Sequence, residues 1–219
     1  MTTLADLWPP AALAVTCGDL ELRYADDDLL VALAELAAEG VHAPDAMPFF
    51  VPWTRGTPTE VARSVLAYQW GVRSRMSPDS WALELAVLRR GEVLGMQSIS
   101  SREFPVLRTA ESGSWLGRRH QGQGVGTRMR LMVLHLLFDG LDAQQATTGA
   151  FADNPASNAV TRRIGYAENG TELLQREGKA AANLRYVLSR EAWERRPSDQ
   201  RLDVSYTGLA ALRDYLGIS

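Results

Sequence analysis

Apolar positions recur with two different periods in the first third of the chain, which predicts both strand and helix there. Residues 20–24 alternate apolar and polar positions as a strand does, whereas the leucines of residues 29–36 recur at helical spacing. Three aspartates at 26–28 precede that helix, where acidic side chains favour the positive end of its dipole. A second amphipathic helix is expected over residues 59–76, ended by Ser77-Pro78-Asp79.

The segment between these two helices has a different character. Residues 40–58 contain four prolines together with Phe49, Phe50 and Trp53. Proline removes a backbone donor and fixes φ, so regular helix is excluded. We expect an ordered loop that presents aromatic side chains toward a substrate.

The centre of the chain predicts an antiparallel start to a sheet. Strand-like runs at 81–88 and 92–100 are joined by Arg89-Arg90-Gly91, as in a hairpin. A third run ends at Trp115-Leu116. A glycine-punctuated turn then leads into a helix predicted over 125–138 and closed by Gly140.

The last third predicts a second strand-to-helix unit and a tail. A strand over residues 146–151 precedes a short helix that ends at Ile164, and further strands are expected at 166–174 and 184–188. Beyond Arg195 the chain is polar and then favours a strand at 204–206 and a helix at 209–216. We therefore expect one α/β domain over 1–195, with an extension over 196–219 packed on that domain or at a dimer interface.

Composition narrows the class of protein. The chain is 46% hydrophobic and 22% charged, and its net charge of -3 does not favour nucleic acid or a membrane surface as partner. The apolar run 131–138 is far shorter than the ~20 residues of a membrane span. Residues 1–10 carry neither a basic start nor a long apolar run, so we expect no secretion signal there; a single cysteine, Cys17, excludes an internal disulfide framework, and we expect a cytoplasmic protein.

The glycine-rich turn is the first candidate site. A strand that runs into Gly122, Gly124 and Gly126 and then into a helix places unpaired N–H groups at the positive end of the helix dipole, where an anion binds. A dinucleotide fingerprint is not matched because its final glycine would fall at Thr127, and a P-loop lysine is missing. A flexible connection remains the simpler interpretation of the glycines alone.

The stretch Gln121-Gly122-Gln123-Gly124-Val125-Gly126-Thr127 resembles the acyl-CoA motif of the Gcn5-related N-acetyltransferase (GNAT) superfamily, Gln/Arg-x-x-Gly-x-Gly/Ala. With Gly113-Ser114-Trp115-Leu116 before it and Asp153-Asn154-Pro155-Ala156-Ser157 after it, the chain is similar to the RimJ/RimL-type branch. The resemblance covers about residues 15–195. It implies a mixed, mostly antiparallel sheet that splays between its fourth and fifth strands, with flanking helices.

The resemblance also implies how acetyl-CoA, or another short acyl-CoA, would bind. The backbone of the glycine turn would hold the pyrophosphate, the strand before it the pantetheine arm, and two arginines would add charge near the phosphates. The predicted cofactor-binding residues are Trp115, Leu116, Arg118, Arg119, Gln121, Gly122, Gln123, Gly124, Val125, Gly126, Thr127, Asn154 and Ser157. No metal is expected, since His42, His120 and His135 lack ligand spacing.

Direct attack of an amine on a thioester requires a base, and a proton donor helps the thiolate to leave. We predict Glu111, on the strand before the turn, as the base, with Glu84 in reserve. Relatives often carry a tyrosine four residues before the helix-closing glycine, but Thr161 stands there. Ser157 is therefore the predicted donor to the departing sulfur.

The expected function is N-acyl transfer from acyl-CoA to an amine of a small molecule or a protein N-terminus. A non-catalytic acyl-CoA-binding or sensing module is the alternative, because it needs the same turn. Acetyl is the default acyl group, and a homodimer is suggested by the resemblance. The aromatic residues predicted to line the acceptor groove are Phe49, Trp53, Trp70 and Trp81.

Overall fold

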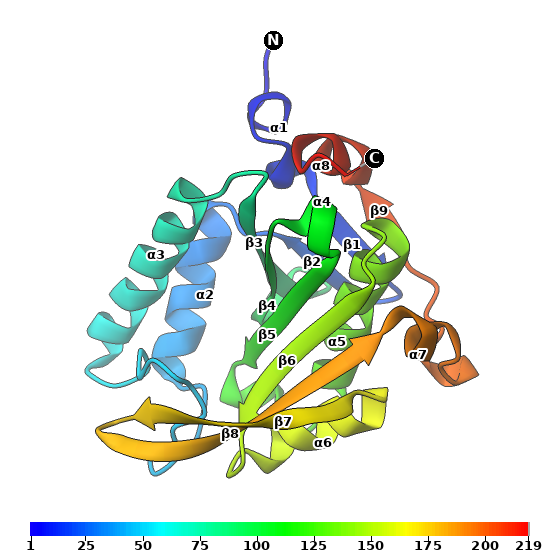
Figure 1. The fold of residues 1–219 in the computed structure, drawn as a ribbon. Coiled ribbons are helices and arrows are strands. Elements are labelled where there is room, and N and C mark those ends of the chain that lie inside the picture. Colours follow the sequence, from blue (N-terminus) through cyan, green and yellow to red (C-terminus); the bar gives the residue numbers. More distant parts are fainter. Residues whose placement is uncertain (219) are drawn as a thin grey trace.

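The computed structural model describes residues 1–218 and contains one nine-stranded mixed sheet with helices on both faces (Figure 1). The strand order is β7-β8-β6-β5-β4-β3-β2-β1-β9, and only the β5–β6 pair is parallel. The strands are β1 (Ala14–Cys17), β2 (Leu20–Tyr24), β3 (Ser80–Arg89), β4 (Glu92–Arg102), β5 (Thr109–Leu116), β6 (Gln145–Phe151), β7 (Ala167–Arg176), β8 (Lys179–Ser189) and β9 (Ser205–Thr207).

Two helices with clear start signals cover one face of the sheet. Helix α2 (Asp27–Glu39) begins where the Asp26 carboxylate accepts from the Leu29 N–H at 2.9 Å. Helix α3 (Pro58–Ser74) begins at a capping box between Thr57 and Glu60. The other helices are α1 (Leu4–Leu7), α4 (Phe104–Leu107), α5 (Val125–His135), α6 (Pro155–Ile164), α7 (Arg190–Glu194) and α8 (Leu209–Tyr215).

Alternation along the central strands sends side chains to two separate cores. On β3, Leu83, Leu85 and Val87 pack with α5, whereas Ala86 and Leu88 pack with α2 and α3. Residues of one parity therefore face the α5 side and those of the other parity face the α2/α3 side. This division decides which polar side chains share a face, including those considered below.

Strands β5 and β6 share hydrogen bonds only at their beginnings. The register joins Thr109–Glu111 to Gln145–Thr147, while β6 pairs along its whole length with β8. Beyond Glu111 the two strands therefore separate and leave a V-shaped opening. The predicted splay is confirmed. It was expected between the fourth and fifth strands and lies between β5 and β6, because the unpredicted β1 adds one strand at the start of the chain.

The tail joins the far edge of the sheet. Strand β9 pairs antiparallel with β1, with Thr207 opposite Ala14, and α8 follows it beside the N-terminal segment (Figure 1). The predicted tail strand and helix are thus present, while the division at residue 195 stays a prediction. Within residues 1–218, no helix is both long and apolar enough to cross a membrane.

Candidate active site

The glycine turn lies between β5 and α5 and has the backbone shape of an anion cradle. Gly122 and Gly124 have φ of 72° and 77°, which L side chains rarely adopt, and Gly124 is the N-cap of α5. A Cβ at either position would meet nothing within 4 Å, so the turn opens outward. Across the described residues, the amides of 122–127 donate to no backbone carbonyl outside the helix ladder. These amides are free to bind an anion.

Side chains from the turn fix it to the loop after α2. The Gln121 amide donates to the carbonyls of Val41 at 2.6 Å and Leu116 at 2.9 Å. The backbone N–H of Arg118 donates to the Gly40 carbonyl at 3.0 Å. The cradle is therefore held in place before any ligand arrives.

The two arginines of the turn differ in their freedom. Arg119 pairs with Glu39 and donates to His120, so its charge is already engaged. Arg118 is exposed and makes no ion pair among residues 1–218. Only Arg118 is therefore placed to meet a phosphate without first breaking an ion pair.

The V-shaped opening has polar groups on both sides. On α6, the Asn154 side chain accepts from the Ser157 N–H at 3.1 Å and so caps the helix. The half-buried Ser157 hydroxyl makes no hydrogen bond to any described residue. Thr161 is fully buried and donates back to the Ser157 carbonyl at 2.9 Å, so it does not replace the missing tyrosine.

A buried polar cluster underlies β5 on the α5 side, and the sequence patterns did not single it out. Arg130 donates to the Ser114 hydroxyl at 3.2 Å, and burial lowers the pKa of its guanidinium. Two of its nitrogens have no partner within the described chain. Thr148 donates to the Ser112 carbonyl at 2.9 Å beside it. An arginine inside an otherwise apolar helix was the available sequence signal.

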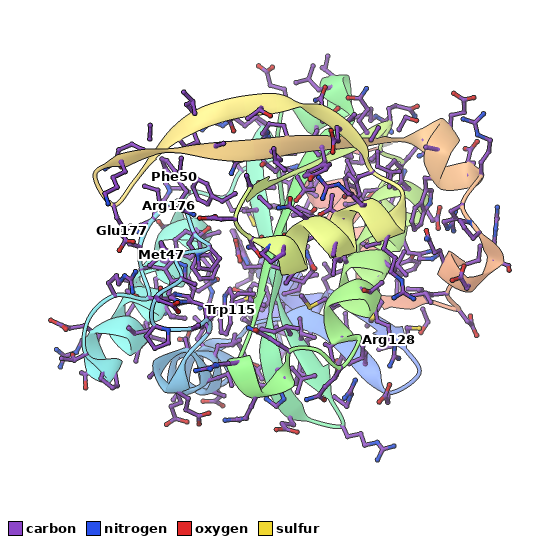
Figure 2. All side chains as sticks on the ribbon, turned by 90° about the horizontal axis from the view of Figure 1, so that it is seen from below. Met47, Phe50, Trp115, Arg128, Arg176 and Glu177 are labelled. Carbon is purple, nitrogen blue, oxygen red and sulfur yellow. The ribbon has the colours of Figure 1, made fainter. Side chains whose placement is uncertain are left out.

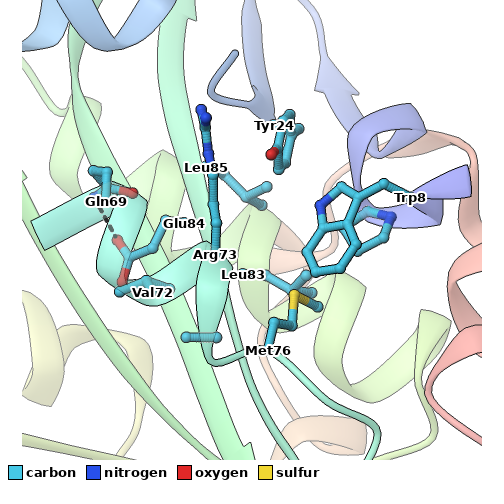
Figure 3. A pocket seen from close by; sticks show the side chains of 11 residues that line it. Trp8, Tyr24, Gln69, Val72, Arg73, Met76, Leu83, Glu84 and Leu85 are labelled. Carbon is cyan, nitrogen blue, oxygen red and sulfur yellow. Dashed lines mark hydrogen bonds between the residues drawn. The ribbon is translucent and has the colours of Figure 1, made fainter. Parts of the chain in front are cut away.

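The two candidate bases lie on the α2/α3 side of the sheet in different surroundings. Glu111 is exposed and accepts from the Arg185 guanidinium at 3.0 Å, which also approaches Glu172 at 3.5 Å. Glu84 is partly buried and accepts from Tyr68 at 3.3 Å. It also accepts from Gln69 at 3.4 Å (Figure 3). Burial raises the pKa of Glu84 to about 7.

Two of the four predicted groove aromatics lie together. The rings of Phe49 and Trp53 are 4.9 Å apart, and Trp53 is 5.7 Å from Trp115 on β5, forming a row from the loop to the splayed strand. Trp81 does not line this face, because its parity turns it into the α5-side core, 2% exposed and against Phe104.

Trp70 is also separate from the row. It is 52% exposed on α3 and points its ring N–H at Asp27, 3.4 Å away. The apolar pattern alone did not show which face of α3 is buried, because α3 buries only part of its surface and Trp70 lies outside that part. The structure therefore supports only Phe49 and Trp53 of the predicted set as neighbours of the opening.

The tip of the β7–β8 hairpin is tied to the loop between α2 and α3. Arg55 binds the Glu177 carboxylate through bonds of 2.7 and 3.1 Å. Arg176 donates to the Met47 carbonyl at 3.0 Å, and Figure 2 shows Arg176, Glu177 and Met47 in the same region. Arg176 also pairs with Asp153, just before α6. We call these contacts of Arg55, Glu177, Arg176, Asp153 and Met47 the strap.

Two curated proteins are similar to this chain in sequence. The Escherichia coli ribosomal-protein-serine acetyltransferase is 28% identical over 123 residues, 56% of this chain and 63% of the relative; a Bacillus subtilis relative is 29% identical over 122 residues, 55% of this chain and 66% of the relative. The chain thus spans just under two thirds of these relatives' lengths.

Solved structures agree on the fold. Mycobacterium smegmatis RimJ in complex with a CoA-disulfide superposes with a TM-score of 0.67 at 21% identity, covering 94% of this chain and 95% of that one. RimL, a ribosomal L7/L12 alpha-N-protein acetyltransferase in complex with coenzyme A, gives 0.62 at 24% identity, covering 82% and 99%. The acetyltransferase (GNAT) domain model matches residues 19–167, more than half of the sequence. The chain therefore belongs to the GNAT acetyltransferase family.

Proposed function

We propose that the protein transfers an acyl group, acetyl by default, from acyl-CoA to an amine. The observation that carries this proposal is the cradle of free amides at 122–127, placed at the mouth of the β5–β6 splay. If the diphosphate of an acyl-CoA binds at the cradle, the rest of that long, thin ligand would extend into the opening. Membership of the GNAT acetyltransferase family supports the proposed acyl transfer.

The residues present fit coenzyme A. The amides of 122–127 and the free Arg118 would bind the phosphates, and the β5 edge beyond Glu111 would hydrogen-bond the amide groups of the pantetheine arm. When bound, acetyl-CoA supplies the activated thioester. The Ser157 hydroxyl would donate a proton to the sulfur, and the buried Arg130 charge below β5 would favour negative charge nearby.

The acceptor we propose is the α-amine of a protein N-terminus. Two relatives carry names that specify ribosomal proteins, and the row of Phe49, Trp53 and Trp115 offers apolar contact area beside the splay. The strap covers this region, so an extended chain end fits it better than a folded surface. A cytoplasmic location and a homodimer are further parts of this proposal.

Substitution in the cradle tests the proposal. In Gly124→Val, a branched side chain on a left-handed backbone would distort the cradle, so we expect CoA affinity measured by calorimetry to fall at least tenfold. Gly91→Val is the matched control, because Gly91 has φ of 85° and equally open surroundings in the β3–β4 turn. Unchanged CoA affinity in Gly124→Val would contradict the proposal.

A second measurement separates transfer from mere binding. Release of free thiol from acetyl-CoA should depend on an added peptide with a free N-terminus and stop when that terminus is acetylated in advance. Tight CoA binding without amine-dependent thiol release would instead indicate a non-catalytic acyl-CoA-binding module.

A further inference from the structure

One carboxylate on the face of the sheet that carries the aromatic row, two strands away from β5, is held by no described cation. Glu84 projects from β3 toward the α2/α3 side and accepts only from the neutral groups of Tyr68 and Gln69, at 3.3 and 3.4 Å. Among residues 1–218 it forms no ion pair, whereas Glu111 is bound by Arg185 at 3.0 Å. Protonating a carboxylate that is paired with a guanidinium removes the charge attraction of the ion pair, and Glu84 has no such pair to weaken.

The register of the sheet places Glu84 in one row with the splayed strand. Glu84 lies opposite Ser98 on β4, and Ser98 lies opposite Gly113 on β5. Adjacent strands are ~4.8 Å apart, so the Glu84 backbone is about 10 Å from Gly113. A bound amine and a bridging water would have to span the remaining distance between the Glu84 carboxylate and the splayed strand.

The residues of this row other than Glu84 are small. Gly113 is the second residue beyond the last β5–β6 pair, and a Cβ there would lie 3.1 Å from the Ser98 hydroxyl. Ser98 itself donates to the Gly113 carbonyl at 3.1 Å, which keeps its side chain flat on the sheet. A group above Gly113 therefore meets the small Ser98 side chain between the splay and Glu84.

We propose that Glu84, and not Glu111, is the base that takes the proton from the acceptor amine, with Tyr68 and Gln69 holding its carboxylate in place. The proposal rests on the proposed acyl transfer. The acceptor ammonium gives one proton to Glu84, its nitrogen forms the amide bond as the C–S bond breaks, and its second proton ends on the departing sulfur. Glu84 then returns its proton to solvent.

The groups around Glu84 suit this role. Tyr68 is 56% exposed yet reaches the carboxylate, so Glu84 lies at the edge of an open region. On the other side, Arg73 and Tyr24 line the adjacent cavity, and Arg73 is neutralised by Asp27 at 2.6 Å (Figure 3). Burial raises the pKa of Glu84, and the bonds from Gln69 and Tyr68 oppose that rise only in part. The free base is thus available at neutral pH and is basic enough to accept a proton.

Three variants test the assignment. Glu84→Gln keeps the shape and should lower kcat with a peptide amine 10²- to 10⁴-fold, while CoA affinity stays within twofold. Tyr68→Phe removes an exposed donor, so the acidic limb of the pH–rate profile should move to higher pH. Glu111→Gln is the matched control and should retain both that limb and most of the turnover.

A readout that needs no acyl donor completes the test. With ¹³C-labelled glutamate, one carboxyl resonance of the CoA-free protein should titrate near neutral pH. This resonance should disappear in Glu84→Gln, and the midpoint of its titration should move to higher pH in Tyr68→Phe. Unchanged turnover in Glu84→Gln, or loss of the limb in Glu111→Gln alone, would overturn the assignment. If the wild type bound CoA but showed no amine-dependent turnover, the proposed function would fail instead.

Discussion

Arg176 holds Asp153 in a two-pronged ion pair, with Nη1 and Nη2 2.8 and 2.6 Å from the two carboxylate oxygens. The pair joins the last residue of β7 to the turn that precedes α6. Because Arg176 also donates to the Met47 carbonyl and lies over the Phe151 ring at 4.3 Å, one side chain connects three segments around the opening. The strap is therefore centred on a single residue.

Arg176→Ala should loosen the acceptor region without unfolding the protein. The Asp153 side chain is 65% exposed and that of Arg176 18%, so the pair should contribute about 1 kcal/mol to global stability and Tm should fall by only a few degrees. The hairpin tip and the 40–57 loop would lose a shared contact, and we expect KM for a peptide acceptor to rise several-fold with CoA affinity unchanged. Arg162→Ala, which breaks the exposed Arg162–Glu168 pair on α6, is the control. Equal KM changes in both variants would contradict a specific role for the strap.

The tryptophans predicted as one set should separate experimentally. Trp81→Ala removes a buried ring from the core and should cost about 3–5 kcal/mol of unfolding free energy. Trp53→Ala truncates a partly buried loop side chain, so its cost should stay within about 2 kcal/mol while KM for an apolar peptide acceptor rises. Urea denaturation and steady-state kinetics together check both. A larger stability loss in Trp53→Ala than in Trp81→Ala would refute this division.

Glu84 should make stability depend on pH in an unusual direction. Its pKa is raised by burial from 4.5 to about 7, so the folded state binds more protons than the unfolded chain between these values. The resulting stabilisation is fully present below pH 4.5 and is lost as pH rises through about 7. Glu84→Gln lacks this dependence, so relative to wild type it should gain about 2–3 kcal/mol between pH 4.5 and 8.

Urea denaturation of both proteins across that pH range measures the difference directly. Glu111→Gln serves as comparison, because it removes an exposed carboxylate on the same face of the sheet. A constant difference between Glu84→Gln and wild type at all pH values would mean that Glu84 titrates like an exposed carboxyl.

Local signals carried most of the element prediction. The helix starts at Asp26 and Asn154, the hairpin turn at Arg90-Gly91 and the glycine cradle rest on backbone angles and caps that a few adjacent residues set. Strand β1 was missed because four residues carry too little periodicity, and it forms by pairing with β2 and β9.

The sequence by itself determined the order of elements and the presence of an anion-binding turn, since both follow from short-range geometry. Only the tertiary structure decided which side chains meet. Glu84 and Gly113 share a row because the β3–β4–β5 register aligns them, and Arg185 reaches Glu111 across the sheet from β8. Trp81 and Glu84 lie three residues apart on one strand, so their opposite parity sends one to the α5-side core and the other toward α3. The register between strands, and the helices that cover each face of the sheet, depend on pairing between distant segments, which no local pattern encodes.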